Sequence, residues 1–376
     1  MKEENEVLDR LEKFERGSEG IKNLSSFTVF RNDFKLLSSQ LGRKGFDFIN
    51  RYFNRKNSRH VLVSSGEAED IDKLTGKDYK LLLSIKPINN LISINEFFEA
   101  INYKLEKDGT FICRFTPQER VERRILTKYF FPINHMVYLG YFLFRRVCPK
   151  LSITRRFYFK LTKGRNRSLR KLEILGRLIA CGYEPVKEYY TGEHVYLVAK
   201  KQKTPFVDKY SSYGLLFKMR RIGKGGKEIL VYKLRTMVPF SEYLQAHFLK
   251  TNRLAKGGKI RNDSRITPLG KWLRKFWIDE IPNLVNLLKG EMKLVGVRPI
   301  SRQYFSLYDK ELQYLRKLVK PGVIPPFYAD LPETLDEIQE SEKRYIKSYL
   351  KKPLQTDIKY LFLAVKNILI KRVCSK

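Results

Sequence analysis

Short apolar runs alternate with helix-like segments in the first half of the chain, and this alternation constrains the fold more than any other feature. Runs with strand character are HVLVSS (60–65), YKLLLSI (79–85) and TFICRF (110–115). Between the last two lies INEFFEAINYKLEKDG (94–109), whose apolar residues fall at helical spacing and which ends at a glycine. Strands that alternate with helices predict an α/β domain.

The same pattern continues to the end of this half. Residues 168–201 indicate a helix, a Gly-containing turn, a strand, a second turn and a second strand. The strand–helix–KDG–strand unit and the later GRLIACGYE unit resemble the second half of a class I methyltransferase-like Rossmann domain. No GxGxG loop follows an early strand, so the resemblance implies a degenerate Rossmann-like architecture and no methyl transfer. We therefore predict an N-terminal α/β domain over residues 1–203.

The charge of the chain restricts its partners. Lys and Arg number 75 against 40 Asp and Glu, so the formal net charge is +35, while 43% hydrophobic residues suffice for a packed core. An excess of this size calls for an anionic partner: nucleic acid, an anionic membrane surface or a phosphorylated substrate. No helix-turn-helix, RNP or zinc-finger pattern supports nucleic acid. We expect a membrane surface and a phosphorylated substrate, and no nucleic acid.

Cysteine and histidine usage gives no sign of a metal centre or of disulfides. Cys113, Cys148, Cys181 and Cys374 are far apart, and the four histidines lack metal-ligand spacing, so we expect a reduced, cytoplasmic protein without zinc. Residues 1–25 look like a polar helix or arm and lack an apolar signal region. No run of about 20 apolar residues occurs, so no standard transmembrane helix is expected.

Two apolar segments have alternative interpretations. YFFPINHMVYLGYFLFRRVCPK (129–150) is rich in aromatic residues, and its apolar part, 129–147, is too short to span a bilayer upright. It is either an interfacial or re-entrant helix or a buried core helix. The tail TDIKYLFLAVKNILIKRV (356–373) has a helical apolar stripe that either packs on the domain or lies on a membrane.

Basic clusters mark the second half of the chain. RIGKGGKE followed by ILVYKLRTM (221–237) indicates a hairpin with a Gly-Gly turn, which gathers Arg221, Lys224, Lys233 and Arg235. Taken alone, a solvated basic hairpin is the simpler interpretation. Two further basic clusters follow, at 261–280 and 290–308.

Adjacent carboxylates lie between these clusters, in WIDEIPNLVNLL. A structural interpretation makes Asp279 the N-cap of a helix with Pro282 in the first turn and Glu280 favoured by the helix dipole. That interpretation leaves the gathering of bases unexplained. A helix N-terminus also draws phosphate. A carboxylate there stays ionised and can attack phosphorus, while its neighbour can hold Mg2+.

Residues 212–325 as a whole resemble the bacterial sugar transferase family, the polyprenyl-phosphate sugar-1-phosphate transferases or monotopic phosphoglycosyl transferases. The Arg-x-Gly turn and YK-x-RTM elements stand at Arg221, Gly223, Tyr232, Lys233, Arg235, Thr236 and Met237. The D-x-R-x-T-x-x-G-x-x-L-R element stands at Asp263, Arg265, Thr267, Gly270, Leu273 and Arg274. The DE-x-P-x-L-x-N-x-L-x-G-x-M element stands at Asp279, Glu280, Pro282, Leu284, Asn286, Leu288, Gly290 and Met292. The VG-x-RP and KPG elements stand at Val295, Gly296, Arg298, Pro299, Lys320, Pro321 and Gly322.

This resemblance implies a two-step transfer of sugar-1-phosphate from a UDP-sugar to polyprenyl phosphate, which starts exopolysaccharide or lipopolysaccharide synthesis at the cytoplasmic face of the inner membrane. Asp279 would be the nucleophile, and Glu280 would bind Mg2+. The residues implied in phosphate binding are Arg221, Lys233, Arg235, Arg265, Arg274 and Arg298. For residues 204–376 it implies a mixed α+β catalytic domain with amphipathic helices.

The chain departs from the family pattern at three places. Val297 replaces the proline of VGPRP, and VIPPFYADLPETLDEI (323–338) replaces a TGWAQV-type segment. The stretch before the catalytic domain, 204–219, is short and polar where the family has an apolar re-entrant helix. Three alternatives for membrane contact then remain: residues 129–147, the basic face together with the tail helix, or a membrane protein partner. A catalytically silent relative that binds a nucleotide-sugar or lipid phosphate as a scaffold is the alternative, although the intact carboxylate pair opposes it.

Overall fold

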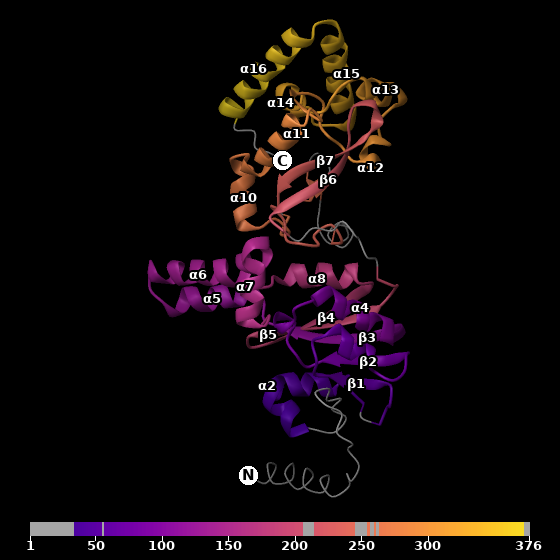
Figure 1. Cartoon of the computed structure of the whole chain (residues 1–376), viewed down its shortest axis with the longest axis vertical. Coiled ribbons are helices and arrows are strands. Elements are labelled where there is room, and N and C mark those ends of the chain that lie inside the picture. Colours follow the sequence, from indigo (N-terminus) through magenta and orange to yellow (C-terminus); the bar gives the residue numbers. More distant parts are fainter. Residues whose placement is uncertain are drawn as a thin grey trace, which may run out of the picture.

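The computed structural model describes residues 34–54, 56–205, 214–244, 254–255, 259–260 and 263–371. The polar helix or arm expected over 1–25 and Cys374 lie outside these residues. Figure 1 shows a lower part built around strands β1–β5 and an upper part that contains β6, β7 and helices α10–α16.

A mixed five-stranded sheet organises the N-terminal part. Its strands are β1 (His60–Val63), β2 (Tyr79–Ser84), β3 (Leu105–Phe115), β4 (Tyr183–Thr191) and β5 (His194–Lys201), in the order β1-β2-β3-β5-β4. β1, β2 and β3 pair in parallel, whereas β5 is antiparallel to both β3 and β4. The predicted α/β class is therefore confirmed, and each predicted strand is present, although β3 begins five residues before the predicted run because its first residue pairs with Tyr79.

Helices cover both faces of this sheet. The bounds are α2 (Phe34–Asn50), α3 (Ala68–Asp72), η1 (Ile88–Asn90), α4 (Ile94–Lys104) and α8 (Lys171–Ala180). Leu82 and Phe111 point into the core beneath α4 and α8, and Leu83 and Ile112 point to the opposite core beside Phe48 of α2. Neighbouring strand residues face opposite sides, so a sheet buried on both faces needs continuous apolar strands. This explains why the runs in the sequence do not alternate with polar residues.

A helical projection is inserted between β3 and α8. It consists of α5 (Gln118–Lys128), α6 (Ile133–Phe142), the π-helical η2 (Leu143–Val147), η3 (Cys148–Lys150) and α7 (Ser152–Thr162). Figure 1 shows α5 and α6 side by side, extending away from the sheet. Phe131, Met136 and Leu139 of this segment are exposed, so the buried-core interpretation of residues 129–147 is wrong. Within the ranges given above, no helix combines the length and apolarity needed to cross a membrane.

The C-terminal part begins with the predicted hairpin. β6 (Leu216–Ile222) pairs antiparallel with β7 (Glu228–Leu234) across η4 (Lys224–Gly226), where Gly225 and Gly226 both have positive φ. The short strands β8 (Leu254–Ala255) and β9 (Lys259–Ile260) pair with each other, and β10 (Lys293–Val295) pairs in parallel with β11 (Gly322–Ile324). The remaining elements are α10 (Pro268–Lys275), η5 (Ile278–Asn283), α11 (Leu284–Leu288), α12 (Arg302–Phe305), α13 (Lys310–Leu318), α14 (Phe327–Asp330), α15 (Leu335–Lys351) and α16 (Pro353–Lys371).

A separate core forms where β10, α13, α15 and α16 meet. Val295, Leu312 and Tyr345 are buried there, and α16 contributes Tyr360 to the cluster. The tail therefore packs on the domain through one side. Its other side leaves Phe362 and other apolar side chains exposed.

The segment after β7 packs against the N-terminal sheet domain. Leu244 belongs to the core beneath α8, and the guanidinium of Arg177 lies 4.4 Å from the ring centroid of Phe240. A Cβ on Gly176 would stand 2.5 Å from the carbonyl oxygen of Phe240, so only glycine allows this approach. The two parts are therefore in contact, while the proposed boundary between residues 203 and 204 stays a prediction.

Candidate functional site

The carboxylate pair lies on η5, immediately after α10. Trp277 adopts a left-handed conformation (φ 60°) and turns the chain from α10 into η5. The predicted N-cap role of Asp279 is wrong, because Asp279 lies inside a 3-10 turn and the α-helix begins only at Leu284. The turn through Pro282 separates the pair from the helix start. Asp279 is 4% exposed.

A lysine from the hairpin meets this pair. Lys233 of β7 donates a hydrogen bond to the Glu280 carboxylate at 2.6 Å, and both side chains are largely buried. Burial raises the pKa of Asp279 and the charge of Glu280 raises it further, while Lys233 and Arg274 oppose the rise. The sequence-based expectation that a helix N-terminus keeps Asp279 ionised is therefore replaced by a balance between burial and two cations. Among the described residues, no hydrogen-bond donor reaches Oδ1 of Asp279.

Close packing of α10 against the end of β7 brings Arg274 to the pair. The amide of Thr267 donates to the carbonyl of Thr236 at 2.9 Å, and Thr267 caps α10 by accepting from the amide of Gly270. A Cβ on Gly270 would stand 2.0 Å from the Thr236 oxygen, so a side chain there would force α10 away from the end of β7. Arg274 then donates through Nε to the Thr236 hydroxyl at 2.9 Å. Burial lowers the pKa of Arg274, and Asp279 opposes that shift.

Arg265 has a structural partner. It forms a buried ion pair with Asp263, with Nη2 2.6 Å from Oδ2, and donates to the carbonyl of Ser241 at 3.2 Å. Its backbone carbonyl accepts from the amide of Val238 at 2.9 Å. These bonds fix the loop that follows β7 to the loop that precedes α10. The predicted role of Arg265 in phosphate binding stays a prediction.

Three further predicted phosphate ligands lie on the hairpin and on the VGVRP loop. The amide of Ile222 donates to the carbonyl of Ile300 at 3.0 Å, which places the end of β6 beside the loop that carries Arg298. Burial lowers the pKa of Arg221, and the charge of Arg298 lowers it further. Two neighbouring guanidinium groups suit a phosphate, which accepts paired N–H donors. Arg235 instead donates to the carbonyl of Gly214 at 3.0 Å and stacks over Phe217 at 4.9 Å. The structure therefore groups Lys233 and Arg274 with the carboxylate pair, and Arg221 with Arg298.

Sequence reasoning assigned no role to Asn286. This fully buried side chain accepts a hydrogen bond from the amide of Tyr232 at 3.2 Å and donates to the carbonyl of Leu230 at 2.6 Å. It also donates to Glu291 at 2.7 Å. These bonds join α11 to β7, so Asn286 helps to hold η5 beside Lys233. The position of Asn286 in the DE-x-P-x-L-x-N motif is the sequence signal that could have identified this residue.

Sequence reasoning also missed the contact between Trp277 and Tyr328. The two ring centroids are 4.6 Å apart in an edge-to-face arrangement, and Tyr328 is buried. Asn367 of α16 donates to the carbonyls of Tyr328 and Ala329 at 3.0 and 2.8 Å. Segment 323–338, which departs from the family pattern, therefore packs two residues from Asp279. No local pattern signals a contact between segments so distant in sequence.

Val297, which replaces the proline of the family's VGPRP element, packs in the core of the C-terminal part. Val297 is buried among apolar residues, and its carbonyl accepts from the amide of Gly322 at 2.9 Å. A Cβ on Gly322 would stand 2.1 Å from the amide nitrogen of Gly296, so the VG-x-RP and KPG elements require both glycines. This contact fixes the backbone that carries Arg298.

Comparisons with known proteins concern the part of the chain that carries these residues. Residues 205–371 match the profile described as "Bacterial sugar transferase". A UDP-N-acetylgalactosamine-undecaprenyl-phosphate N-acetylgalactosaminephosphotransferase of Aeromonas hydrophila is 34% identical over 163 residues, which are 41% of this chain and 35% of that protein. An undecaprenyl-phosphate galactose phosphotransferase of Salmonella typhimurium is 38% identical over 109 residues, 28% of this chain and 23% of that protein. The chain thus spans about a third or less of the length of these two relatives.

Solved structures give a much weaker likeness. An S-adenosylmethionine-dependent methyltransferase from Listeria monocytogenes is 12% identical with a TM-score of 0.24, covering 43% of this chain and 78% of its own. A TM-score at this level supports no conclusion. The α/β assignment therefore rests on the strand pairing described above.

Proposed function

Because residues 205–371 belong to the bacterial sugar transferase family, we propose that the chain transfers a sugar-1-phosphate from a UDP-sugar to polyprenyl phosphate. This reaction would start a glycan such as an exopolysaccharide or lipopolysaccharide at the cytoplasmic face of the inner membrane. The observation that carries the proposal is the buried Asp279–Glu280 pair with Lys233 and Arg274 against it. Buried carboxylates matched by cations suit phosphoryl chemistry better than a surface ion pair does.

In the proposed first step, a carboxylate oxygen of Asp279 attacks the sugar-side phosphorus of the donor. A new P–O bond forms to the aspartate, the P–O bond to UMP breaks, and UMP leaves with the electron pair. Oδ1 of Asp279 is buried and has no hydrogen-bond partner within the described part of the chain, so the attack requires η5 or a neighbouring side chain to move and open this oxygen to the donor. The raised pKa of Asp279 makes its ionised form more nucleophilic, while Lys233 and Arg274 favour ionisation.

In the proposed second step, the phosphate of the lipid carrier attacks the same phosphorus. The bond to Asp279 breaks, the carboxylate is restored, and a sugar-diphosphate-polyprenol is released. Charge on the phosphate oxygens then needs fixed cations near the pair. Lys233 and Arg274 lie beside it, and we assign a second phosphate to Arg221 and Arg298, whose segments are joined by the bond from the Ile222 amide to the Ile300 carbonyl.

The resemblance also implies Mg2+, and the residues fit it in a limited way. Among the described residues, no group of three or more His, Cys, Asp or Glu side chains is placed to hold a metal ion. Mg2+ is usually held by one or two carboxylates together with substrate phosphates, so a carboxylate pair is sufficient. We assign Glu280 as its protein ligand, in competition with Lys233 at 2.6 Å. Bound there, Mg2+ would neutralise phosphate oxygens of the donor. Glu280→Gln is expected to raise the Mg2+ concentration needed for half-maximal turnover.

The two parts of the chain have different proposed folds. We infer that the N-terminal sheet is a degenerate methyltransferase-like Rossmann domain, which its parallel β1–β3 strands and closing antiparallel β4–β5 hairpin support. The C-terminal part would be the α+β phosphoglycosyl transferase domain. We infer no methyl transfer, because the cofactor loop is missing from the sequence.

UMP release tests the proposed reaction. Wild type, Asp279→Asn and a control, Asp336→Asn on the exposed start of α15, are incubated with a panel of UDP-sugars, detergent-solubilised polyprenyl phosphate and Mg2+. We expect wild type and control to release UMP from one donor or a few, and Asp279→Asn to remain folded and inactive. Absence of UMP from folded wild type with every donor would favour a silent scaffold, and normal turnover by Asp279→Asn would exclude the assigned nucleophile.

A further inference from the structure

The helical projection carries a large apolar surface that no described part of the chain covers. We define the α6–α7 apolar surface as the exposed apolar side chains of residues 130–143 together with Ile153, Phe157 and Leu161. Phe130 and Phe131 at the tip between α5 and α6 are 71% and 75% exposed, and Ile153 is 94% exposed. A concentration of exposed apolar side chains of this kind on one segment of a protein indicates a binding site.

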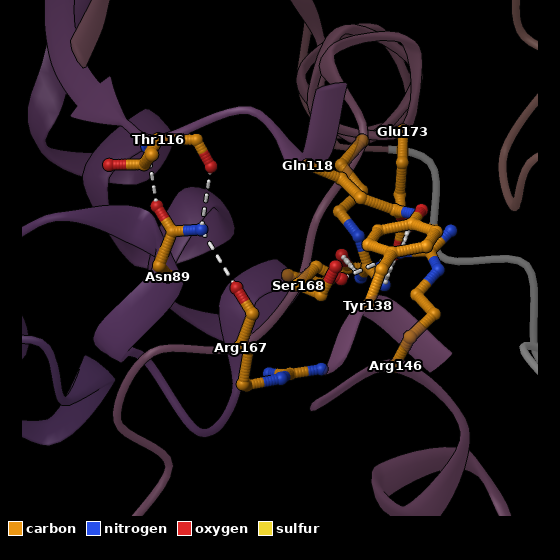
Figure 2. Close-up of polar contacts among 10 residues, drawn as sticks. Asn89, Thr116, Gln118, Tyr138, Arg146, Arg167, Ser168 and Glu173 are labelled. Carbon is orange, nitrogen blue, oxygen red and sulfur yellow. Dashed lines mark hydrogen bonds and ion pairs between the residues drawn. The ribbon is translucent and has the colours of Figure 1, made fainter. Parts of the chain in front are cut away.

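The projection is firmly attached to the sheet domain at its base. Figure 2 shows this base, where Gln118 at the start of α5 donates to the Tyr138 hydroxyl of α6 at 3.0 Å. Arg146 of η2 donates to the carbonyl of Ser168 at 2.9 Å and forms a buried ion pair with Glu173 of α8. Burial would raise the pKa of Glu173, but Arg146 and its neighbouring cations hold it well below the usual range. The exposed surface is therefore the outer side of a packed structure.

The exposed apolar side chains of α6 lie on one side of the helix. At 100° per residue, Ile133, Met136, Val137 and Leu139 span an arc of roughly 160°. Buried Asn134 and half-buried Tyr138 lie on the opposite arc, towards α5 and the domain. An apolar arc with polar residues opposite it is the arrangement of a helix that lies in a membrane interface with its apolar face buried.

The charge around this surface has one sign. No Asp or Glu occurs between Glu122 and Glu173, whereas Lys and Arg recur throughout that stretch. Exposed bases flank the apolar side chains, Lys128 beside the tip and Arg155, Arg156 and Lys160 on α7. A helix that binds an anionic membrane places aromatic and aliphatic side chains in the lipid and basic residues beside them, where they contact the phospholipid headgroups.

From the exposed apolar side chains and the basic residues beside them, we propose that the α6–α7 apolar surface lies in the headgroup region of an anionic phospholipid bilayer. This contact attaches the chain to one leaflet. A helix at such an interface enters the boundary between headgroups and acyl chains by about 5–10 Å. Lys128 and the bases of α7 then contact lipid phosphates. This surface lies in the N-terminal part, outside residues 205–371 that match the sugar transferase family. The proposal deepens the proposed function, because the surface would bring the chain to the bilayer that contains the lipid carrier. It does not depend on the transfer chemistry.

Vesicle sedimentation of the full chain, with no sugar donor, tests the surface. Vesicles of phosphatidylcholine alone are compared with vesicles that also contain phosphatidylglycerol, at low and high salt. The test variant is Phe130→Ser with Phe131→Ser. The control is Tyr103→Ser with Tyr314→Ser, which removes two exposed aromatic rings from α4 and α13. A second variant, Arg156→Glu with Lys160→Glu, tests the charge.

Wild type and control are expected to bind the anionic vesicles, with weaker binding at high salt and to pure phosphatidylcholine. The Phe130/Phe131 variant loses apolar burial, and the Arg156/Lys160 variant loses attraction to the headgroups, so each should bind the anionic vesicles at least about tenfold more weakly. Their UMP release in detergent should equal that of wild type, so failure of this proposal is separable from failure of the proposed reaction. Wild-type binding by the Phe130/Phe131 variant would overturn the proposal. So would a wild type that ignores vesicles but self-associates through the same phenylalanines, because the surface would then join two copies.

Discussion

Gly270→Ala tests whether the proposed active site depends on the close packing of α10 against the end of β7. The added Cβ would stand 2.0 Å from the carbonyl oxygen of Thr236, which belongs to the backbone and has no rotamer to escape into. α10 would have to move by about an ångström or more to restore a normal contact. That movement would stretch the bond from the Thr267 amide to Thr236 and would withdraw Arg274 from Asp279.

The expected cost follows from these contacts. Overpacking at a rigid site costs about 1–3 kcal/mol, and a lost backbone hydrogen bond costs about 1 kcal/mol. Alanine is favoured over glycine in a helix by about 1 kcal/mol, which offsets part of the loss. We expect Gly270→Ala to lower the free energy of unfolding by about 1–3 kcal/mol. Turnover should fall by at least about tenfold, because a cation beside the carboxylate pair is displaced.

Gly140→Ala is the matched control. Gly140 lies within α6, and a Cβ there would meet nothing within 4 Å. The same substitution should therefore leave the free energy of unfolding unchanged or raise it by up to about 1 kcal/mol, with normal turnover. Urea unfolding followed by circular dichroism and the UMP assay measure both quantities. If Gly270→Ala is as stable and as active as Gly140→Ala, the packing argument for α10 is wrong.

Two further substitutions separate structural from catalytic roles. Lys233→Met and Lys293→Met each remove the cation of a partly buried ion pair and should each cost about 1–3 kcal/mol of stability. Only Lys233→Met, which removes a cation beside the carboxylate pair, should reduce UMP release strongly, and equal turnover of the two variants would contradict the role of Lys233. Tyr328→Leu should lower turnover with little change in KM, because it removes the ring that packs against Trp277. Tyr328→Phe keeps that ring and should have turnover near that of wild type. Similar losses of turnover in both variants would assign the effect to the hydroxyl group instead.

Local patterns in the sequence predicted the elements whose structure is decided locally. The runs at 60–65 and 79–85 became strands because each is apolar on both faces of a covered sheet, and the Gly-Gly turn after Arg221 closed the predicted hairpin. The ordered motifs also marked Lys233, Arg274 and the carboxylate pair, which come together in the structure, while their roles in the reaction stay predictions.

Other features depend on contacts that no local pattern encodes. Asp279 has the composition of an N-cap, but the turn at Trp277 places it inside a 3-10 helix. That turn is packed against Tyr328, which lies in the segment where the family pattern is lost. Residues 129–147 have the composition of a core helix as much as of an interfacial one, and only their position on a projection reveals that they are exposed.

The central claim is that Asp279 becomes covalently attached to the sugar-phosphate of the donor. Intact-protein mass spectrometry after incubation with the active UDP-sugar and Mg2+, without polyprenyl phosphate, tests it most directly. The account predicts that wild type gains the mass of one sugar-phosphate on Asp279, that Asp279→Asn gains nothing, and that added polyprenyl phosphate removes the adduct. A wild type that turns over without any adduct, or an adduct that persists in Asp279→Asn, would contradict it.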